Sequence, residues 1–188
     1  MISADRLQLG GLSFELFLDS HTIEKCIESL AHRINVRYGE EQVSLVVVLE
    51  GASCFFQHLH PQLLFPWTSY RVRIKTYDGL HTSREARVDW LDELTDPSTP
   101  VLILEDIVET GKTLEALREN VRSRGVSDLG IASLLWKPSC TTASVVPDFT
   151  GREIGPEFVV GFGMDYCNEG RTLSSIYRLP NELYEKSP

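Results

Sequence analysis

The chain has 188 residues, of which 42% are apolar, 9% aromatic and 24% charged. This composition excludes a disordered chain, a coiled coil and a collagen-like fibre, and it is typical of a single globular domain. The net charge of −9 disfavours binding to nucleic acid or to an anionic membrane through bulk charge. We therefore expect any phosphate to be held by a local device, such as backbone amides, a few cations or a bridging metal.

Cysteine spacing and terminal composition indicate a cytoplasmic protein with no membrane partner. The four cysteines lie far apart, without a CxxC pair or zinc-ribbon spacing, and are expected to be reduced thiols. The N-terminal residues lack the basic start and apolar stretch of a signal peptide. The densest apolar run, residues 45–49, is too short to cross a bilayer.

Apolar periodicity divides the first half of the chain into strands and helices. The β-branched run 44–49 is typical of a strand buried on both faces, and Gly39 is a good stop for the helix before it. The polar stretch 76–85 has too few apolar residues to pack and is interpreted as a mobile loop. The expected elements are strands over 13–18, 44–49 and 71–75 and helices over 22–38 and 53–60.

The second half of the chain contains the clearest fold signal. A buried strand over 100–104, a loop over 105–113, a helix over 114–124 and a strand over 130–136 follow one another. Because both strands are apolar, this order indicates a right-handed parallel crossover. The fold class is therefore predicted to be α/β, with a doubly wound, mostly parallel sheet flanked by helices.

The residues after Lys137 change to short strands and turns, which predicts a small hood over the carboxyl edge of the sheet. Internal repeats and low-complexity tracts are absent. We expect one domain over residues 1–188, with a core over about 20–140 and a hood built from about 1–18 and 141–188.

The loop EDIVETGKT, residues 105–113, has the composition of a phosphate site. Ligands of open parallel sheets bind beyond the carboxyl ends of the strands, where this loop lies. Thr110, Gly111 and Thr113 supply hydroxyls and a permissive backbone at a helix N-terminus, whose free N–H groups attract an anion. This arrangement suits one phosphate monoester.

The segment TGKT suggests a triphosphate-binding loop, but that motif requires a glycine where Asp106 stands. Glu105, Asp106 and Glu109 would also surround a polyphosphate with negative charge. Carboxylates are suited instead to hydroxyls, a metal ion or developing positive charge. A phosphorylated sugar with a cationic anomeric centre in its transition state offers all three, so the residues favour a phosphosugar ligand.

The stretch 101–113, VLILEDIVETGKT, resembles the phosphoribosyl pyrophosphate motif of the type I phosphoribosyltransferases. Segments similar to the hypoxanthine-guanine branch of this family follow in family order: VVVLEGASCFF at 46–56, KTYDG at 75–79, LLWKP at 134–138 and FVVGFGMDYCNEGR at 158–171. The resemblance implies a purine-salvage transferase that moves the 5-phosphoribosyl group from phosphoribosyl pyrophosphate to hypoxanthine or guanine. The implied products are IMP or GMP and pyrophosphate. It also implies Mg²⁺ as cofactor and a homodimer or homotetramer.

The resemblance further implies roles for individual residues. Glu109 is the implied catalytic carboxylate at the purine N7 proton. Asp165 is implied to bind Mg²⁺, while Glu105 and Asp106 hold the ribose hydroxyls directly or through metal-bound water. The remaining implied positions are Gly51, Thr110, Gly111, Lys112, Thr113 and Arg171 for phosphoribosyl pyrophosphate, Lys137, Phe158 and Val159 for the purine, and Thr76 and Tyr77 for a closing lid.

Three further expectations concern the loops of the site. Glu109 stands where the family usually has aspartate, and its extra methylene matters because a misplacement of about 1 Å can cost about 100-fold in rate. Glu50 stands where the pyrophosphate loop usually has lysine, and we expect its side chain to point away. The family places a cis peptide between Gly51 and the residue before it.

Other functions stay open at this stage. Glu109 and Glu50 are compatible with a regulator that binds phosphoribosyl pyrophosphate or a nucleotide with weak turnover. A pyrimidine phosphoribosyltransferase is the alternative among enzymes, whereas the charge of −9 disfavours an RNA-binding attenuator on the same fold. Ordinary structural roles are also compatible with the sequence: Glu109 as a helix cap, Lys137 as a surface residue and Phe158 as a core aromatic.

Overall fold

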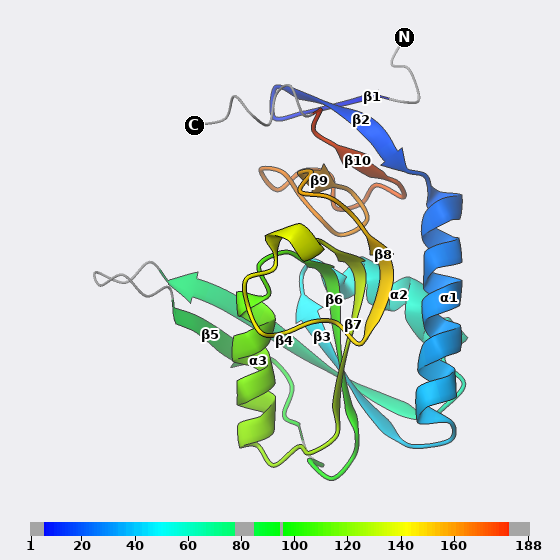
Figure 1. Cartoon of the computed structure of the whole chain (residues 1–188), viewed down its shortest axis with the longest axis vertical. Helices are drawn as coiled ribbons and strands as arrows, with labels where there is room; N and C mark the ends of the chain where they lie inside the picture. The colour runs from blue at the N-terminus through cyan, green and yellow to red at the C-terminus, as the bar shows by residue number, and fades with distance from the viewer. Residues whose placement is uncertain (1–5, 78–84, 95, 181–188) are drawn as a thin grey trace.

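The structure is a computed structural model that describes residues 6–77, 85–94 and 96–180. Figure 1 shows a large twisted sheet between helices, with a smaller sheet beyond one end of its strands. The strands of the large sheet are β3 (Val43–Leu49), β4 (Trp67–Tyr77), β5 (Glu85–Trp90), β6 (Val101–Val108), β7 (Leu129–Trp136) and β8 (Phe149–Glu153). Their order is β5-β4-β3-β6-β7-β8, and every pairing is parallel except that of β5 with β4. The predicted α/β fold class is confirmed.

Helices cover both faces of this sheet, which buries the apolar central strands. The helix α1 (Ser20–Tyr38) packs beside α2 (Ala52–Leu59) on one face, and α3 (Lys112–Ser123) covers the other. The Asp19 carboxylate accepts the N–H of Thr22 at 2.7 Å and so caps the start of α1. None of the described helices has the length and apolar content needed to cross a bilayer.

The strand order reverses between β3 and β6. The connection through α2 leads from β3 outward to β4, whereas the connection through α3 leads from β6 to β7 on the opposite side. A crevice is expected where two such crossovers leave neighbouring strands in opposite directions. The carboxyl ends of β3 and β6 therefore mark the place where a ligand site is expected.

The strand β6 is longer than predicted, and this changes the assignment of the acidic residues. Residues 105–108 were expected in a loop, but they continue the parallel ladder with β7, from Glu105 opposite Ser133 to Val108 opposite Trp136. The loop is confined to residues 109–111, because α3 begins at Lys112. Backbone pairing with a neighbouring strand thus outweighs the polar side chains of the segment.

One edge strand was missed, and a second was assigned to the wrong sheet. The expected loop over 76–85 is wrong at both ends, since β4 continues to Tyr77 and β5 begins at Glu85; its middle lies outside the described residues. The strand β8 lies in a segment expected to form the hood, yet it pairs in parallel with β7. Asp148 prepares this pairing, because its backbone N–H and carboxylate both bond to the backbone of Ile131.

The hood is a separate antiparallel sheet made from both ends of the described chain. Its strands are β1 (Arg6–Leu9), β2 (Leu12–Leu18), β9 (Val159–Val160) and β10 (Ile176–Arg178), in the order β1-β2-β10-β9. A small apolar cluster around Phe14, Val160 and Leu179 holds it together. A turn after β9 reaches down to the end of β3, because Gly163 packs directly against the carbonyl of Gly51.

Candidate functional site

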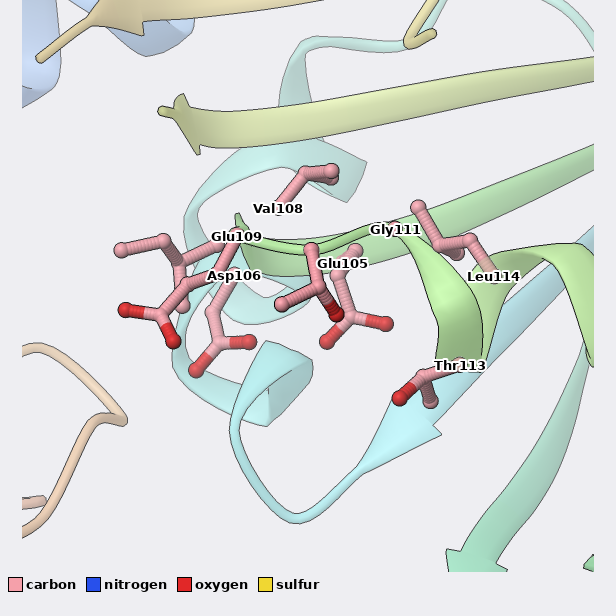
Figure 2. Close-up of a pocket in the computed structure, with 9 residues that line it drawn as sticks. Glu105, Asp106, Val108, Glu109, Gly111, Thr113 and Leu114 are labelled. Atoms are coloured by element: carbon pink, nitrogen blue, oxygen red, sulfur yellow. The ribbon is translucent and has the colours of Figure 1, made fainter. Parts of the chain in front are cut away.

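A cavity of about 230 Å³ lies at the carboxyl end of β6, lined by residues 105–111, 113 and 114. Figure 2 shows Glu105, Asp106 and Glu109 along the strand end, with Thr113 in the first turn of α3. Gly111 takes the left-handed conformation, with φ of 77°, and caps this helix. The first N–H groups of a helix have no partner within it, so the cavity adjoins a local source of donors for an anion.

A second cavity, of about 220 Å³, lies between β6 and the hood. Both cavities are lined by Asp106, Ile107 and Glu109, so these residues separate two adjoining compartments. The hood residues that line the second cavity are Phe158, Val159, Met164, Asp165 and Arg171. The arrangement offers an anion-binding compartment and an aromatic-walled compartment on either side of Glu109.

Half-buried Glu105 and buried Asp106 form an acidic pair in the lining of the first cavity. Asp106 is 7% exposed, and Oε2 of Glu105 is buried without a hydrogen-bond partner. Burial raises the pKa of both carboxyls, although the charge of Arg171 acts in the opposite direction on the pKa of Asp106. A buried acceptor without a partner costs free energy, which a ligand hydroxyl or a cation would recover.

Gly51 is held against this acidic pair. A Cβ at position 51 would overlap the carboxylate of Asp106, so any larger residue there would require the Asp106 side chain to shift. The cis peptide joins Leu49 to Glu50, one bond earlier than expected. This bond follows the last residue of β3, and Gly51 has helical backbone angles as the cap of α2.

Glu50 has a charged partner on the neighbouring strand. Its Oε1 lies 3.4 Å from Nη2 of Arg73, which is opposite Leu49 in the β3–β4 register. Both side chains are about half exposed. Glu50 and Arg171 also line a third cavity, of about 450 Å³, next to the hood. The acidic side chain therefore stays at the mouth of the site, with its charge partly balanced.

Lys137 forms an ion pair with Glu109, which lines the first two cavities, whereas Lys137 itself lines neither. The side chain of Lys137 is 3% exposed, so the interpretation of this lysine as a surface residue is wrong; that of Glu109 is 52% exposed. The N–H of Lys137 donates to the carbonyl of Val108 at 2.8 Å, which continues the β6–β7 pairing one step further. Lys137 is thus a buried cation whose counter-ion is accessible to solvent.

The hood contributes a second ion pair and an aromatic wall. Nη2 of Arg171 lies 2.6 Å from Oδ1 of Asp165, and Nη1 of Arg171 donates to the carbonyl of Gly163 at 2.7 Å. The ring of Phe158 packs edge-on against Tyr166, with centroids 5.8 Å apart, and also lines the second cavity. Phe158 is therefore both a core aromatic of the hood and a wall of the site.

The structure brings together most of the residues that the sequence singles out. Lys112 is an exception, because it is exposed in the first turn of α3 and lines none of these cavities. Thr76 and Tyr77 lie at the end of β4, before residues that the structure does not describe. Sequence reasoning missed four apolar lining residues, Ile107, Val108, Leu114 and Met164. Their only signal was apolar character within or next to the motifs, which equally suits a core.

Carboxylate oxygens of this kind suit Mg²⁺, which binds through one or two carboxylates and completes its shell with water and substrate oxygens. Glu105 supplies an orphaned buried oxygen for such an ion. Among the residues that the structure describes, no group of three or more His, Cys, Asp or Glu side chains is placed to hold a metal. The donor set therefore fits an ion that is shared with a substrate rather than one enclosed by protein alone.

Comparison with known proteins gives concordant matches. Residues 14–167 match the model of the phosphoribosyl transferase domain. A hypoxanthine-guanine phosphoribosyltransferase of Staphylococcus epidermidis is 32% identical over 173 residues, which cover 91% of this chain and 96% of that protein.

Solved structures show the same likeness. A hypoxanthine phosphoribosyltransferase from Staphylococcus aureus superposes with a TM-score of 0.82 at 30% identity, covering 90% of this chain and 93% of that one. A variant of the hypoxanthine phosphoribosyltransferase from Trypanosoma cruzi, described as a ternary substrates complex, gives a TM-score of 0.81 at 28% identity. It covers 90% of this chain and 96% of that one.

The first cavity predicts where a phosphate ester binds. We expect ribose 5-phosphate to place its ester at residues 110–113, and Thr113→Val to raise its Kd about tenfold, because a hydrogen bond to a charged group is lost. Calorimetry measures the affinity and crystal soaking the position. Thr68→Val, at an exposed threonine near the amino end of β4, is the matched control. An ester bound elsewhere, or an unchanged Kd for Thr113→Val, would contradict the assignment.

Proposed function

The chain belongs to the phosphoribosyltransferase family, and we propose that it transfers the 5-phosphoribosyl group of phosphoribosyl pyrophosphate to hypoxanthine or guanine in purine salvage. The observation that carries the proposal is the meeting of two cavities at Glu109. A nucleoside monophosphate needs a phosphate site, hydroxyl acceptors and a ring site in that order. The loop 110–113, the pair Glu105–Asp106 and the wall at Phe158 offer these three in the same order.

The ion pair Lys137–Glu109 supports a 6-oxopurine as the acceptor. Lysine offers only donors and a carboxylate only acceptors. A base with a carbonyl oxygen at C6 and a proton on N7 presents the complementary groups to both side chains. Adenine places an amino group where Lys137 requires an acceptor, and a site with unmatched buried donors rejects such an analogue strongly.

Each remaining site residue has a proposed task in the reaction. The amides and hydroxyls of the loop 110–113 hold the 5′-phosphate, and Phe158 stacks on the base while Val159 presents backbone groups to its edge. As the bond from C1′ to pyrophosphate breaks and the purine nitrogen bonds to C1′, Glu109 accepts the N7 proton. Arg171 pairs with the leaving pyrophosphate beside the loop at Gly51.

Mg²⁺ is the proposed cofactor, with Glu105, Asp106 and Asp165 as the carboxylates that would hold it. When bound, the ion offsets the negative charge of the pyrophosphate. Thr76 and Tyr77 are proposed to begin a lid that excludes water from the closed site. Assembly into a dimer or tetramer, which is usual in the family, stays a prediction.

An assay with several bases tests the proposed function. We expect IMP from hypoxanthine and GMP from guanine in the presence of Mg²⁺ and phosphoribosyl pyrophosphate, with kcat/KM at least about 100-fold lower for adenine and uracil. Chromatography of the products measures each rate. No nucleotide at high enzyme concentration would favour the regulator instead, and preferential formation of UMP would favour a pyrimidine transferase.

The proposed role of Glu109 predicts a split between turnover and affinity. Glu109→Gln removes the proton acceptor and is expected to lower kcat about 100-fold or more, while KM for phosphoribosyl pyrophosphate changes less than about threefold. Steady-state kinetics measure both constants. Glu119→Gln, at an exposed position on α3, is the control for loss of one negative charge. Equal losses in kcat and affinity would contradict the acid–base role.

The position of Glu50 predicts a gain of affinity on charge reversal. Glu50→Lys replaces an anion at the mouth of the site and is expected to lower KM for phosphoribosyl pyrophosphate about threefold to tenfold, with a smaller effect at high salt. Glu41→Lys makes the same charge change at the amino end of β3 and is expected to leave KM unchanged. An unchanged KM for Glu50→Lys would show that this side chain does not act on the pyrophosphate.

A further inference from the structure

The segment 138–145, which follows Lys137, braces the loop that carries Glu109. The N–H groups of Thr142 and Ala143 both donate to the carbonyl of Thr110, at 3.1 and 3.0 Å. A Cβ at Gly111 would lie 3.1 Å from the Cβ of Ala143, so the two segments are in close contact. None of the family motifs identified in the sequence includes residues 139–145.

One hydroxyl in this segment connects both proposed base-contacting residues. Oγ1 of Thr141 accepts the indole N–H of Trp136 at 2.9 Å. The same Oγ1 lies 2.8 Å from the carbonyl oxygen of Glu109 and 3.0 Å from that of Lys137. A hydroxyl has one hydrogen to donate, and the indole N–H occupies its acceptor side, so that hydrogen is directed to the two carbonyls.

We propose that Thr141 is a positioning residue that sets the separation of Glu109 and Lys137. This inference deepens the proposed function and rests on it, because these two side chains face the N7 proton and O6 of the purine there. Thr141 lines neither of the two cavities that meet at Glu109, so it acts through the backbone of the other two residues.

The need for such a brace follows from the chemistry of Glu109. Glutamate has one more rotatable bond than aspartate, and half of this side chain is exposed, so its own packing restrains it weakly. A displacement of about 1 Å at a reacting group can cost about 100-fold in rate. Fixing the backbone on which the side chain pivots reduces that freedom, and the β-branched Thr141 is itself stiff at χ1.

Two substitutions at position 141 separate the hydroxyl from the shape of the side chain. Thr141→Val keeps the shape and removes the hydroxyl; we expect kcat with hypoxanthine to fall about tenfold, with KM for phosphoribosyl pyrophosphate within twofold. Thr141→Ser keeps the hydroxyl and is expected to retain kcat within about twofold. Thr68→Val, at an exposed threonine near the amino end of β4, is the matched control. Thermal melts establish that all three variants are folded.

Crystal structures of the wild type and Thr141→Val test the same inference without turnover. The expected result is a shifted loop 109–111 and a broken Glu109–Lys137 ion pair in the valine variant, but not in the serine variant. An unmoved loop, or equal kinetic losses for valine and serine, would overturn the role of Thr141. A wild-type protein that forms no nucleotide would overturn the proposed function instead, and the crystal structures would still decide the positioning role.

Discussion

The reversal of strand order between β3 and β6 is the constraint on which the site depends. The two crossovers leave β3 and β6 in opposite directions, and α2 begins at the carboxyl end of β3 and also packs against β6. The loop at Gly51 can therefore lie directly on Asp106, and the hood turn at Gly163 lies on Gly51 in turn. Three segments far apart in the chain meet here: Gly51 lies against the Asp106 side chain, and Gly163 lies against the carbonyl of Gly51.

The apolar sheet makes an unfavourable acidic pair tolerable. Residues 43–48 and 101–104 are buried throughout, so β3 and β6 are anchored by burial on both faces before the polar residues begin. The backbone pairing of β6 then keeps Glu105 and Asp106 in the sheet, although their own side chains do not favour a strand. A buried polar group without a hydrogen-bond partner costs free energy. Such groups are typical of functional sites, where the rest of the structure offsets this cost and a bound ligand recovers it.

The fold was predictable from sequence wherever burial follows a simple period. The strands β3, β6 and β7 are runs of apolar residues, and α1 has one apolar face, so these four elements were recognised from the sequence alone. The end of β6 was not, because acidic side chains at 105 and 106 are more typical of a loop than of a strand. The edge strand β5 was missed, and the short strand at Phe149 was assigned to the hood instead of the large sheet, because the sequences of β5 and β8, EARVDW and FTGRE, owe their conformation to a neighbouring strand.

The functional site was likewise predictable from sequence only in part. The cradle at 110–113 is local in sequence, and its chemistry could be deduced from a few adjacent residues. The burial of Lys137, its pairing with Glu109 and the hydroxyl of Thr141 all depend on the position of one strand end relative to another. No local pattern contains that information, and family resemblance supplies it only for residues within the recognised motifs.

Three ion pairs surround the site, and each contains a side chain proposed to act on a substrate: Lys137–Glu109, Asp165–Arg171 and Glu50–Arg73. Paired in this way, the charges need no ligand to satisfy them, which lowers the cost of holding Lys137 in the interior.

A ligand must then replace these partners rather than add to them. In the proposed reaction, a 6-oxopurine would replace both members of the first pair, with an acceptor for the ammonium and a donor for the carboxylate. Pyrophosphate would replace the carboxylate at Arg171 and would offer Asp165 a shared cation. Binding thus exchanges one set of electrostatic partners for another, so the gain for the right ligand is moderate while the penalty for a mismatched one is large. On this argument, specificity in the site comes mainly from the cost of separating charges that already have partners.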